Sequence, residues 1–389
     1  MHPAWVEVDL GAIADNVRAL QATVGNVQMM CVVKADAYGH GLIPVARTAV
    51  AAGADWLATA QLSEALAIRA AGIPTPLLCW LHAPGVDFAP ALEADIDLGV
   101  STEWALDAVI AAAQSLGVTA NVHLKVDTGL GRNGAFSPGE GRTDFAELVD
   151  RAAVAQAAGS INVRGIFSHF AAADEPNHPS VAAQHDAFVA AVALADEAGL
   201  DIEIRHMANS AAALELPHAR WDLVRVGLAM YGLSPTPDLH SSADYGVRPA
   251  MRVIARVSNV KRVPAGQGVS YGYSYTCAED TTLLNVPLGY GDGVPRHASS
   301  KADVLVAGQR RQIAGRVCMD QIVIDAGDLE VACGDEVVLF GPGDDGEPTA
   351  QDWAAAIDTI SYEIVTRFGP HVPRVYLENA ISDDRSNED

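Results

Sequence analysis

The sequence predicts an α/β protein with an N-terminal (β/α)8 TIM-type barrel followed by a mostly β C-terminal domain. The first observation is that eight short apolar runs alternate with alanine-rich helical stretches between residues 29 and 226. Eight strand-then-helix units favour a closed barrel over an open sheet. The second observation is a change of character after Gly232, where a Ser-Pro-Thr-Pro segment ends the pattern and short β-type runs follow.

The eight apolar runs are rich in Val, Ile and Leu, as is typical of parallel strands that are covered on both faces. We expect strands at Met29–Val33, Trp56–Ala60, Pro76–Trp80, Asp97–Val100, Val122–Val126, Val163–Ser168, Ile202–His206 and Asp222–Val226. The helices between them stop at glycines, which tolerate the backbone of a helix C-terminus. They are expected at Gly41–Gly53, Ser63–Gly72, Ser101–Gly117, Asp144–Gly159 and Val181–Ala198.

The second domain is expected to consist mainly of strands and turns. Its β-type runs are Arg252–Val263, Thr282–Pro287, Asp303–Val306, Arg311–Ala314, Gln321–Ile324 and Glu336–Phe340, with one helical stretch at Gln351–Ile357. We therefore divide the chain into a barrel over residues 1–240, a β-rich domain over residues 241–381 and a polar, acidic tail over residues 382–389.

Composition excludes several classes of function. The formal net charge of −24 argues against a nucleic-acid partner, which needs a basic face. No apolar run approaches the roughly 20 residues of a membrane span, and the first residues lack a secretory signal, so we expect a cytoplasmic location and no membrane partner. The five cysteines have no CxxC spacing and are interpreted as buried reduced thiols. No HExxH motif is present, and no metal site is expected.

Lys34, in the segment Val-Val-Lys-Ala-Asp-Ala-Tyr-Gly-His-Gly, is the first candidate for chemistry. It follows the first predicted strand, at the end of a barrel where active sites are built. A buried lysine is unfavourable unless it is paired, lowered in pKa or covalently modified. An imine to a carbonyl cofactor would replace the ammonium with a bond. On strand position alone, a structural ion pair and a catalytic lysine are equally open.

Several segments, in one order along nearly the whole chain, decide between these readings. Besides the Lys34 segment they are KVDTGLGR at 125–132, FSHFA at 167–171, HMANS at 206–210, RVGL at 225–228, VSYGY at 269–273, PLGYGDG at 287–293, CMD at 318–320 and ISYE at 360–363. Together they resemble the bacterial alanine racemase family. The resemblance implies an isomerase that depends on pyridoxal 5'-phosphate (PLP) and interconverts L-alanine and D-alanine, which supplies D-alanine for peptidoglycan of the cell wall.

The resemblance also implies which residues form the site. Lys34 matches the lysine that binds PLP as an imine, and Arg132 matches the arginine that holds the phenolic oxygen and the substrate carboxylate. Lys125 matches a lysine that is carbamylated in some relatives. The other cofactor contacts implied are His169 beside the ring, Asn209, and around the phosphate Tyr38, Ser210, Gly227, Leu228 and Tyr362.

Arg225 matches the residue that faces the pyridine nitrogen of the cofactor. Because arginine keeps its proton in proteins, that nitrogen must accept a hydrogen bond and stays largely unprotonated. An aspartate at this place would make the ring a deep electron sink. The arginine therefore limits side reactions and argues against decarboxylase chemistry.

Inversion at the α-carbon needs a second base, because a proton leaves one face and another returns to the opposite face. Tyr271 matches this second catalytic residue, opposite Lys34. Met319 matches a residue whose backbone N–H binds the substrate carboxylate, and Tyr290 and Tyr362 match residues at the mouth of the pocket. In the family these residues of the β domain come from the partner subunit, so the resemblance implies a head-to-tail homodimer with shared active sites.

Three alternatives are considered. The segment Gly129–Gly134 is a literal GxGxxG after a strand and could indicate a dinucleotide-binding oxidoreductase, but no helical pattern opens after it. A racemase of the same fold with broader specificity, for serine or basic amino acids, is the second alternative, since a small pocket rejects an added hydroxyl only weakly. A small non-catalytic PLP-binding barrel is the third, but such proteins lack the β domain.

Overall fold

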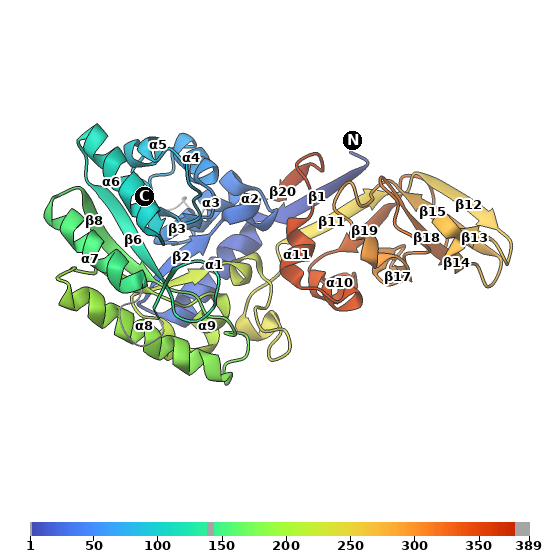
Figure 1. The fold of residues 1–389 in the computed structure, drawn as a ribbon. Helices are drawn as coiled ribbons and strands as arrows, with labels where there is room; N and C mark the ends of the chain where they lie inside the picture. Colours follow the sequence, from blue (N-terminus) through green and yellow to red (C-terminus); the bar gives the residue numbers. More distant parts are fainter. Residues whose placement is uncertain (1, 138–143, 378–389) are drawn as a thin grey trace, which may run out of the picture.

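The computed structural model describes residues 2–137 and 144–377. The N-terminal part is a barrel of parallel strands (Figure 1). Its strands, in spatial order, are β10 (Leu223–Val226), β2 (Gln28–Val32), β3 (Trp56–Thr59), β4 (Leu77–Cys79), β5 (Asp97–Val100), β6 (Ala120–Asp127), β8 (Ile161–Phe167) and β9 (Ile204–His206).

The barrel is nearly closed. β10 pairs with β2, and the seam between β9 and β10 is bridged by a hydrogen bond of 2.9 Å from Arg225 N to Ala208 O and one of 3.1 Å from Asp222 N to Arg205 O. A short strand, β7 (Ala135–Phe136), pairs with β6 outside the main order. All eight predicted barrel strands are confirmed in their predicted order.

Helices surround the barrel strands (Figure 1). Of the predicted helices, α3, α4, α6, α7 and α8 are confirmed, and α6 is followed by the capping residue Gly117, which adopts a φ of 68°. The sequence pattern did not predict α1, α2, α5 or α9. The bounds are α1 (Leu10–Val24), α2 (Lys34–Tyr38), α3 (Leu42–Ala51), α4 (Leu62–Ala70), α5 (Ala89–Glu93), α6 (Glu103–Leu116), α7 (Asp144–Ala157), α8 (Pro179–Glu197) and α9 (Ser210–Glu215).

The second part of the chain is built mostly from strands, as predicted. They are β11 (Met251–Arg256), β12 (Asn259–Val263), β13 (Gly268–Val269), β14 (Tyr275–Thr276), β15 (Thr281–Val286), β16 (Asp303–Val306), β17 (Gln309–Gln312), β18 (Ile322–Gly327), β19 (Glu336–Phe340) and β20 (Arg374–Leu377). Two helices, α10 (Ala350–Ile357) and α11 (Ser361–Thr366), lie between β19 and β20. β12, β15 and β18 form one antiparallel sheet.

The larger sheet of this part contains a strand from the start of the chain. β1 (Ala4–Asp9), which the sequence analysis did not predict, lies between β11 and β20 in the order β17-β16-β19-β11-β1-β20. Figure 1 shows β1 reaching from the barrel into the second part. This sheet therefore contains strands from both sides of the expected boundary between residues 240 and 241. The boundary itself stays a prediction. The expected tail, residues 382–389, lies outside the described residues.

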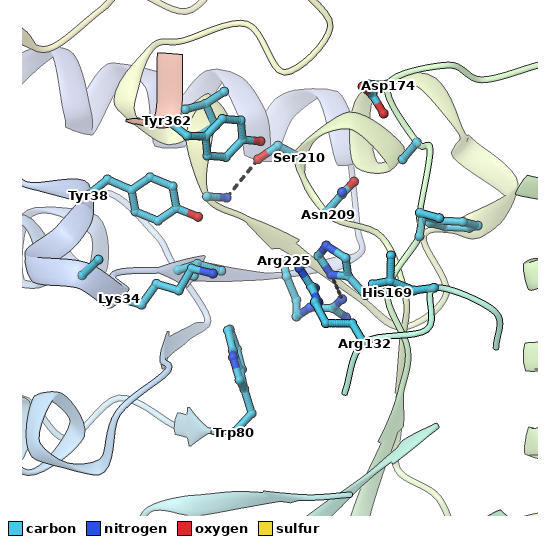
Figure 2. A pocket seen from close by; sticks show the side chains of 18 of the residues that line it. Lys34, Tyr38, Trp80, Arg132, His169, Asp174, Asn209, Ser210, Arg225 and Tyr362 are labelled. Atoms are coloured by element: carbon cyan, nitrogen blue, oxygen red, sulfur yellow. Dashed lines mark hydrogen bonds between the residues drawn. The ribbon is translucent and has the colours of Figure 1, made fainter. Parts of the chain in front are cut away.

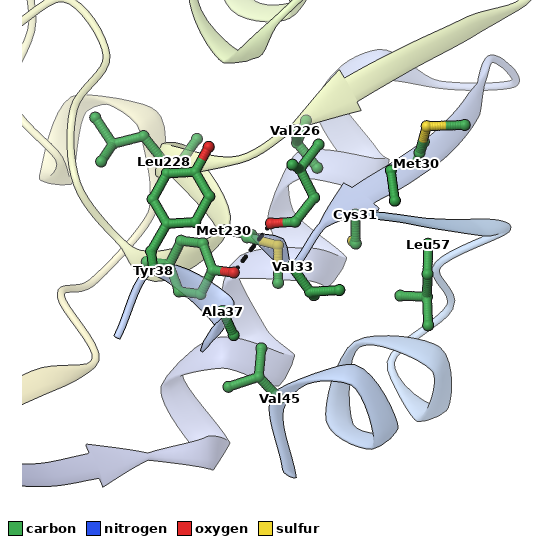
Figure 3. Packing of buried hydrophobic residues seen from close by; sticks show 14 of the residues in the cluster. Met30, Cys31, Val33, Ala37, Tyr38, Val45, Leu57, Val226, Leu228 and Met230 are labelled. Carbon is green, nitrogen blue, oxygen red and sulfur yellow. Dashed lines mark hydrogen bonds between the residues drawn. The ribbon is translucent and has the colours of Figure 1, made fainter. Parts of the chain in front are cut away.

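The backbone after Lys34 is a left-handed turn. Ala35, Asp36, Ala37 and Tyr38 all have φ between 52° and 54°, a conformation that is unfavourable by about 1–2 kcal/mol per L-residue. Ala37 and Tyr38 are nevertheless buried, and Figure 3 shows them packed into the apolar cluster beside β2 and β10. Packing of this segment therefore stabilises a turn that the sequence alone disfavours.

The cysteines differ from the prediction in part. Cys31, Cys79 and Cys277 are buried free thiols, as expected, but Cys318 is half-buried and Cys333 is exposed. The prediction of burial is wrong for these two because both lie in loops of the second part. Within the described residues, no helix combines the length and the apolar character that crossing a membrane requires.

Candidate active site

A cavity of about 650 Å³ opens at the carboxyl ends of the barrel strands (Figure 2). Figure 2 shows Lys34 and Tyr38 on one side of it and Arg132, His169 and Arg225 on the other. Most residues carried over by the resemblance meet here. Those that line the cavity are Lys34, Tyr38, Lys125, Arg132, His169, Asn209, Ser210, Arg225, Gly227, Leu228 and Tyr362.

Four cationic side chains converge on this cavity: Lys34, Lys125, Arg132 and Arg225. Burial, followed by the charge of Arg132, lowers the pKa of Lys34 below its ordinary 10.5. Burial, followed by the charge of Arg225, lowers the pKa of Lys125 to about 7. In a chain with a net charge of −24, this concentration of positive charge favours an anionic ligand.

Arg225 is held by a set of acceptors on its two terminal nitrogens. Nη1 donates to His206 O at 3.0 Å and to His206 Nδ1 at 3.1 Å. Nη2 donates to Ser168 O at 2.6 Å, to Met207 O at 3.1 Å and to His169 Nδ1 at 3.3 Å. Among the described residues the Nε–H has no hydrogen-bond partner, so this donor remains available to a ligand in the cavity.

A small polar cradle lies at the opposite end of the cavity from Arg132. Ser210 Oγ accepts the N–H of Gly227 at 2.9 Å (Figure 2). A Cβ added to Gly227 would lie 2.5 Å from the hydroxyl of Tyr38, so glycine allows this close approach. The ring of Tyr362 lies 6.0 Å from the ring of Tyr38. Hydroxyl groups and tightly turned backbone of this kind suit a phosphate.

Arg132 is positioned by the carboxylate of Asp127 at the end of β6. Asp127 Oδ1 accepts the backbone N–H of Gly129 at 2.9 Å and that of Gly131 at 3.2 Å, and Oδ2 accepts the N–H of Arg132 at 3.0 Å. These are the N–H groups that a dinucleotide pyrophosphate would need. Because Asp127 occupies them, and β7 rather than a helix follows, the GxGxxG segment is not a dinucleotide-binding loop.

The structure corrects one expectation about Tyr362. The resemblance implied that it reaches the site from the partner subunit, together with the other residues of the β domain. Tyr362 instead lies on α11 and lines the cavity of its own chain. Burial, followed by the charge of Asp174, raises its pKa to about 12.

Three other predicted residues lie outside the cavity. Tyr271, Tyr290 and Met319 belong to the second part of the chain and are 70%, 40% and 55% exposed. Tyr290 N donates to Cys318 O at 2.9 Å, and Gly291 N donates to Met319 O at 2.8 Å. These bonds hold Tyr290 and Met319 close together, so these two residues form an exposed apolar and aromatic patch on the second part of the chain.

Sequence reasoning missed several residues of the site. Trp80 lines the cavity at the end of β4, and only its place at the end of a predicted strand could have indicated it. Asp174 also lines the cavity, and no pattern in the sequence marks it; Ile360 lines it too and belongs to the quoted segment 360–363, but no role was expected for it. Asp127 belongs to a quoted motif, but its capping of the Arg132 loop depends on the folded backbone.

Fold and site together define a class: a two-domain protein whose (β/α)8 barrel carries a lysine in a cationic pocket. The family model described as "Alanine racemase, N-terminal domain" matches residues 8–235, and the one described as "Alanine racemase, C-terminal domain" matches residues 250–376. The chain belongs to the alanine racemase family, whose members depend on PLP.

Alanine racemases of several bacteria resemble nearly the whole chain. The alanine racemase of Frankia casuarinae is 55% identical over 95% of this chain and 95% of its own, and that of Streptomyces coelicolor is 54% identical over 96% of each. The crystal structure of alanine racemase from Streptomyces lavendulae, a producer of D-cycloserine, superposes with a TM-score of 0.95 at 53% identity, covering 97% of this chain and 98% of that one.

Proposed function

We propose that this protein is a PLP-dependent racemase that interconverts L-alanine and D-alanine with two bases, Lys34 and Tyr271. The observation that supports this most directly is that Lys34 shares one cavity with Arg132, Arg225 and the polar cradle around Ser210 and Gly227. Full-length relatives named alanine racemase support the same reaction, and broader specificity is not favoured by them.

The residues present fit PLP, which has an anionic phosphate, an aldehyde and a pyridine nitrogen. Ser210, Tyr38, Tyr362 and the backbone at Gly227 would hold the phosphate, and the free Nε–H of Arg225 would face the ring nitrogen. Joined to the amino group of the substrate, PLP would act as an electron sink and so make the α-proton removable.

The chain's own residues hold and move the protons. A lowered pKa gives Lys34 more uncharged amine near neutrality, which is the form that attacks an aldehyde and accepts a proton. Arg132 would orient the substrate carboxylate by a charge-assisted bond. The pKa of about 7 also gives Lys125 much uncharged amine, the form that carbamylation requires, and this modification stays a proposal.

We further propose a head-to-tail homodimer. One chain's cavity contains Lys34, whereas Tyr271 of the same chain is 70% exposed and lies outside that cavity. Two-base inversion requires both groups at one α-carbon. A second copy that seats its Tyr271 and Met319 over the cavity would complete the site and cover the exposed patch. A cytoplasmic location is proposed on the five free thiols, which suit a reducing compartment.

Racemase activity across L-Ala, L-Ser, L-Lys and L-Arg, with added PLP, tests the proposed function. The expected result is rapid formation of D-alanine, weak turnover of serine and negligible turnover of the basic amino acids, because Trp80 and the tyrosines crowd the cavity. A visible absorption band that borohydride abolishes is expected alongside. Absence of both the band and D-alanine would overturn the proposal, and equal rates on arginine would reinstate the broader alternative.

Removal of the Asp127 carboxylate should make the position of Arg132 less fixed, although Asp127 itself is not expected to contact the substrate. Asp127→Ala leaves three backbone N–H groups of the loop without their acceptor, and a displacement of about 1 Å in a substrate-positioning group can lower activity about 100-fold. We expect kcat/KM for alanine to fall by about 10- to 100-fold while PLP stays bound. Asp127→Asn, which keeps an acceptor oxygen, serves as the matched control and should lose less. Equal kcat/KM in Asp127→Ala and the unmodified protein would contradict this role.

A further inference from the structure

A chain of hydrogen-bonded side chains runs through the barrel interior beneath Arg225. His206 Nδ1 lies 3.1 Å from Arg225 Nη1, and His206 Nε2 lies 2.9 Å from His123 Nδ1. His123 Nε2 in turn lies 3.2 Å from Asp97 Oδ2. These four side chains, here called the buried column, come from β10, β9, β6 and β5, and none is more than 5% exposed.

The direction of every proton in the buried column follows from its two ends. Arginine nitrogens only donate, so His206 Nδ1 accepts and the proton of His206 is on Nε2. That proton points to His123 Nδ1, so His123 carries its own proton on Nε2 and donates it to Asp97. A doubly protonated His123 would leave His206 without a proton on either nitrogen. Both imidazoles are therefore neutral, and each has one tautomer.

This order aligns two dipoles between a buried cation and a buried anion. Each imidazole turns its lone pair toward Arg225 and its N–H toward Asp97. Among the described residues, the hydrogen bonds of the Arg225 guanidinium all go to carbonyl oxygens and imidazole nitrogens, and none reaches a carboxylate. Burial lowers the pKa of Arg225 to about 9. The charge of Arg225 is therefore compensated through the two histidines.

Asp97 is anchored at the far end of the barrel. It is the first residue of β5, whereas His206 is the last residue of β9, so the column extends from the amino ends of the strands toward their carboxyl ends. Arg164 Nη1 lies 3.4 Å from Asp97 Oδ2, and Arg164 Nε lies 3.2 Å from Glu203 Oε2. The side chain of Glu203 is 59% exposed, so this ion pair links the column to the surface.

We propose that Asp97 is a positioning residue for Arg225. Its carboxylate selects the Nε2–H tautomer of His123 and thereby that of His206, which presents a lone pair to Arg225. The guanidinium is then held as a charged donor with Nε–H directed into the cavity. This inference deepens the proposed function, because it rests on the role of Arg225 at the cofactor.

The tautomers can be measured without any variant of Asp97. In the holoenzyme labelled with ¹⁵N-histidine, with the two signals assigned by single substitution of each histidine, NMR should show His123 and His206 both neutral and both protonated on Nε2. A signal from Nδ1–H, or from a doubly protonated ring, at either histidine would overturn the proposal. The measurement does not depend on racemase activity.

Two variants separate positioning from mere packing. Asp97→Leu removes the acceptor, and we expect about a 10-fold lower kcat, as for the loss of one charge-assisted hydrogen bond. The KM for alanine should change by less than about 2-fold, because Arg132, which would bind the substrate carboxylate, is not affected. The visible spectrum of bound PLP should shift, because Arg225, which would face the ring nitrogen, is affected. Asp97→Asn keeps an acceptor oxygen and should recover most of the kcat. Glu203→Gln, which removes the other carboxylate from Arg164, is the control and should change neither quantity.

A folded Asp97→Leu with unchanged kcat, spectrum and His206 tautomer would refute the proposal. If Asp97→Leu does not fold, Asp97→Asn and the tautomers of the unmodified protein provide the test. A change of tautomer at His123 or His206 in Asp97→Asn would also refute the proposal. Failure of the proposed function looks different, since the unmodified protein would then lack the PLP band and racemisation while the tautomers stayed measurable.

Discussion

Lys34→Ala is expected to abolish the covalent attachment of PLP and racemisation together. Lys34 is the lysine of the cavity that follows the first barrel strand, and it would serve both as the attachment point and as one of the two bases. Loss of a general base alone lowers a rate by about 100- to 10,000-fold, and loss of the covalent link adds to this. We expect activity to fall by at least about 1,000-fold.

The measurement is the visible spectrum before and after borohydride, recorded beside the rate of D-alanine formation. Lys261→Ala, at an exposed lysine of β12, is the matched control and should keep both. The attachment of PLP to apoprotein should also stay fast down to a lower pH than imine formation by a free lysine, because the lowered pKa of Lys34 leaves its amine uncharged at lower pH. An unchanged band in Lys34→Ala would refute the assignment of this lysine.

Tyr271→Phe is expected to keep PLP but to slow α-proton exchange by about 1,000-fold, with unequal effects on the two enantiomers. The hydroxyl is lost while the ring remains, so packing in the proposed dimer changes little. The inequality arises because each base removes the proton from one enantiomer only. Exchange of the α-proton with deuterated solvent, followed separately from L-alanine and from D-alanine, measures it.

Tyr273→Phe is a close control, since Tyr273 is 71% exposed and only two residues away. It should racemise alanine at the unmodified rate. Full activity in Tyr271→Phe, or equal losses in both variants, would remove the two-base mechanism.

A mixture of the two inactive variants tests the shared site directly. In a mixed dimer of Lys34→Ala and Tyr271→Phe chains, one site carries both lesions and the other combines an intact Lys34 with an intact Tyr271. Random assembly of equal amounts makes half of the dimers mixed, so activity should recover to about a quarter of the unmodified level. No recovery after unfolding and refolding the mixture would mean that both bases come from one chain.

The barrel was predictable from sequence because its strands are buried on both faces and its helices end at glycines. Most candidate site residues came from motifs, and several of these motifs, including those of Lys34 and Arg225, lie at or just after barrel strands. β1 was missed because a single short strand carries no periodic signal, and its neighbours lie far along the chain. The place of Tyr362 was also missed, because which chain supplies a residue depends on the docking of α11 and not on local sequence.

The tautomers of His123 and His206 could not be predicted either. A histidine within a strand has no pattern that states what lies beside it, and only the three-dimensional order of β5, β6, β9 and β10 brings Asp97 into line with Arg225. The GxGxxG segment at Gly129–Gly134 is the opposite case, because its local sequence suggests a function that the folded chain excludes. Its local sequence fits a phosphate loop, and the carboxylate of Asp127 in the folded chain occupies the required N–H groups.

The place of β1 in the sheet bears on how the chain is made. Its six residues are synthesised before the barrel, yet their neighbours in the sheet, β11 and β20, are synthesised after the entire barrel. Until then β1 is an unpaired edge that must be kept from other chains. The sheet can be completed only when β20 has emerged, so a chain cut in the segment 238–246 would not yield two independent halves. Because β1 and β20 stand on opposite sides of the barrel in sequence and pair in one sheet, barrel and β domain are expected to unfold as one cooperative unit.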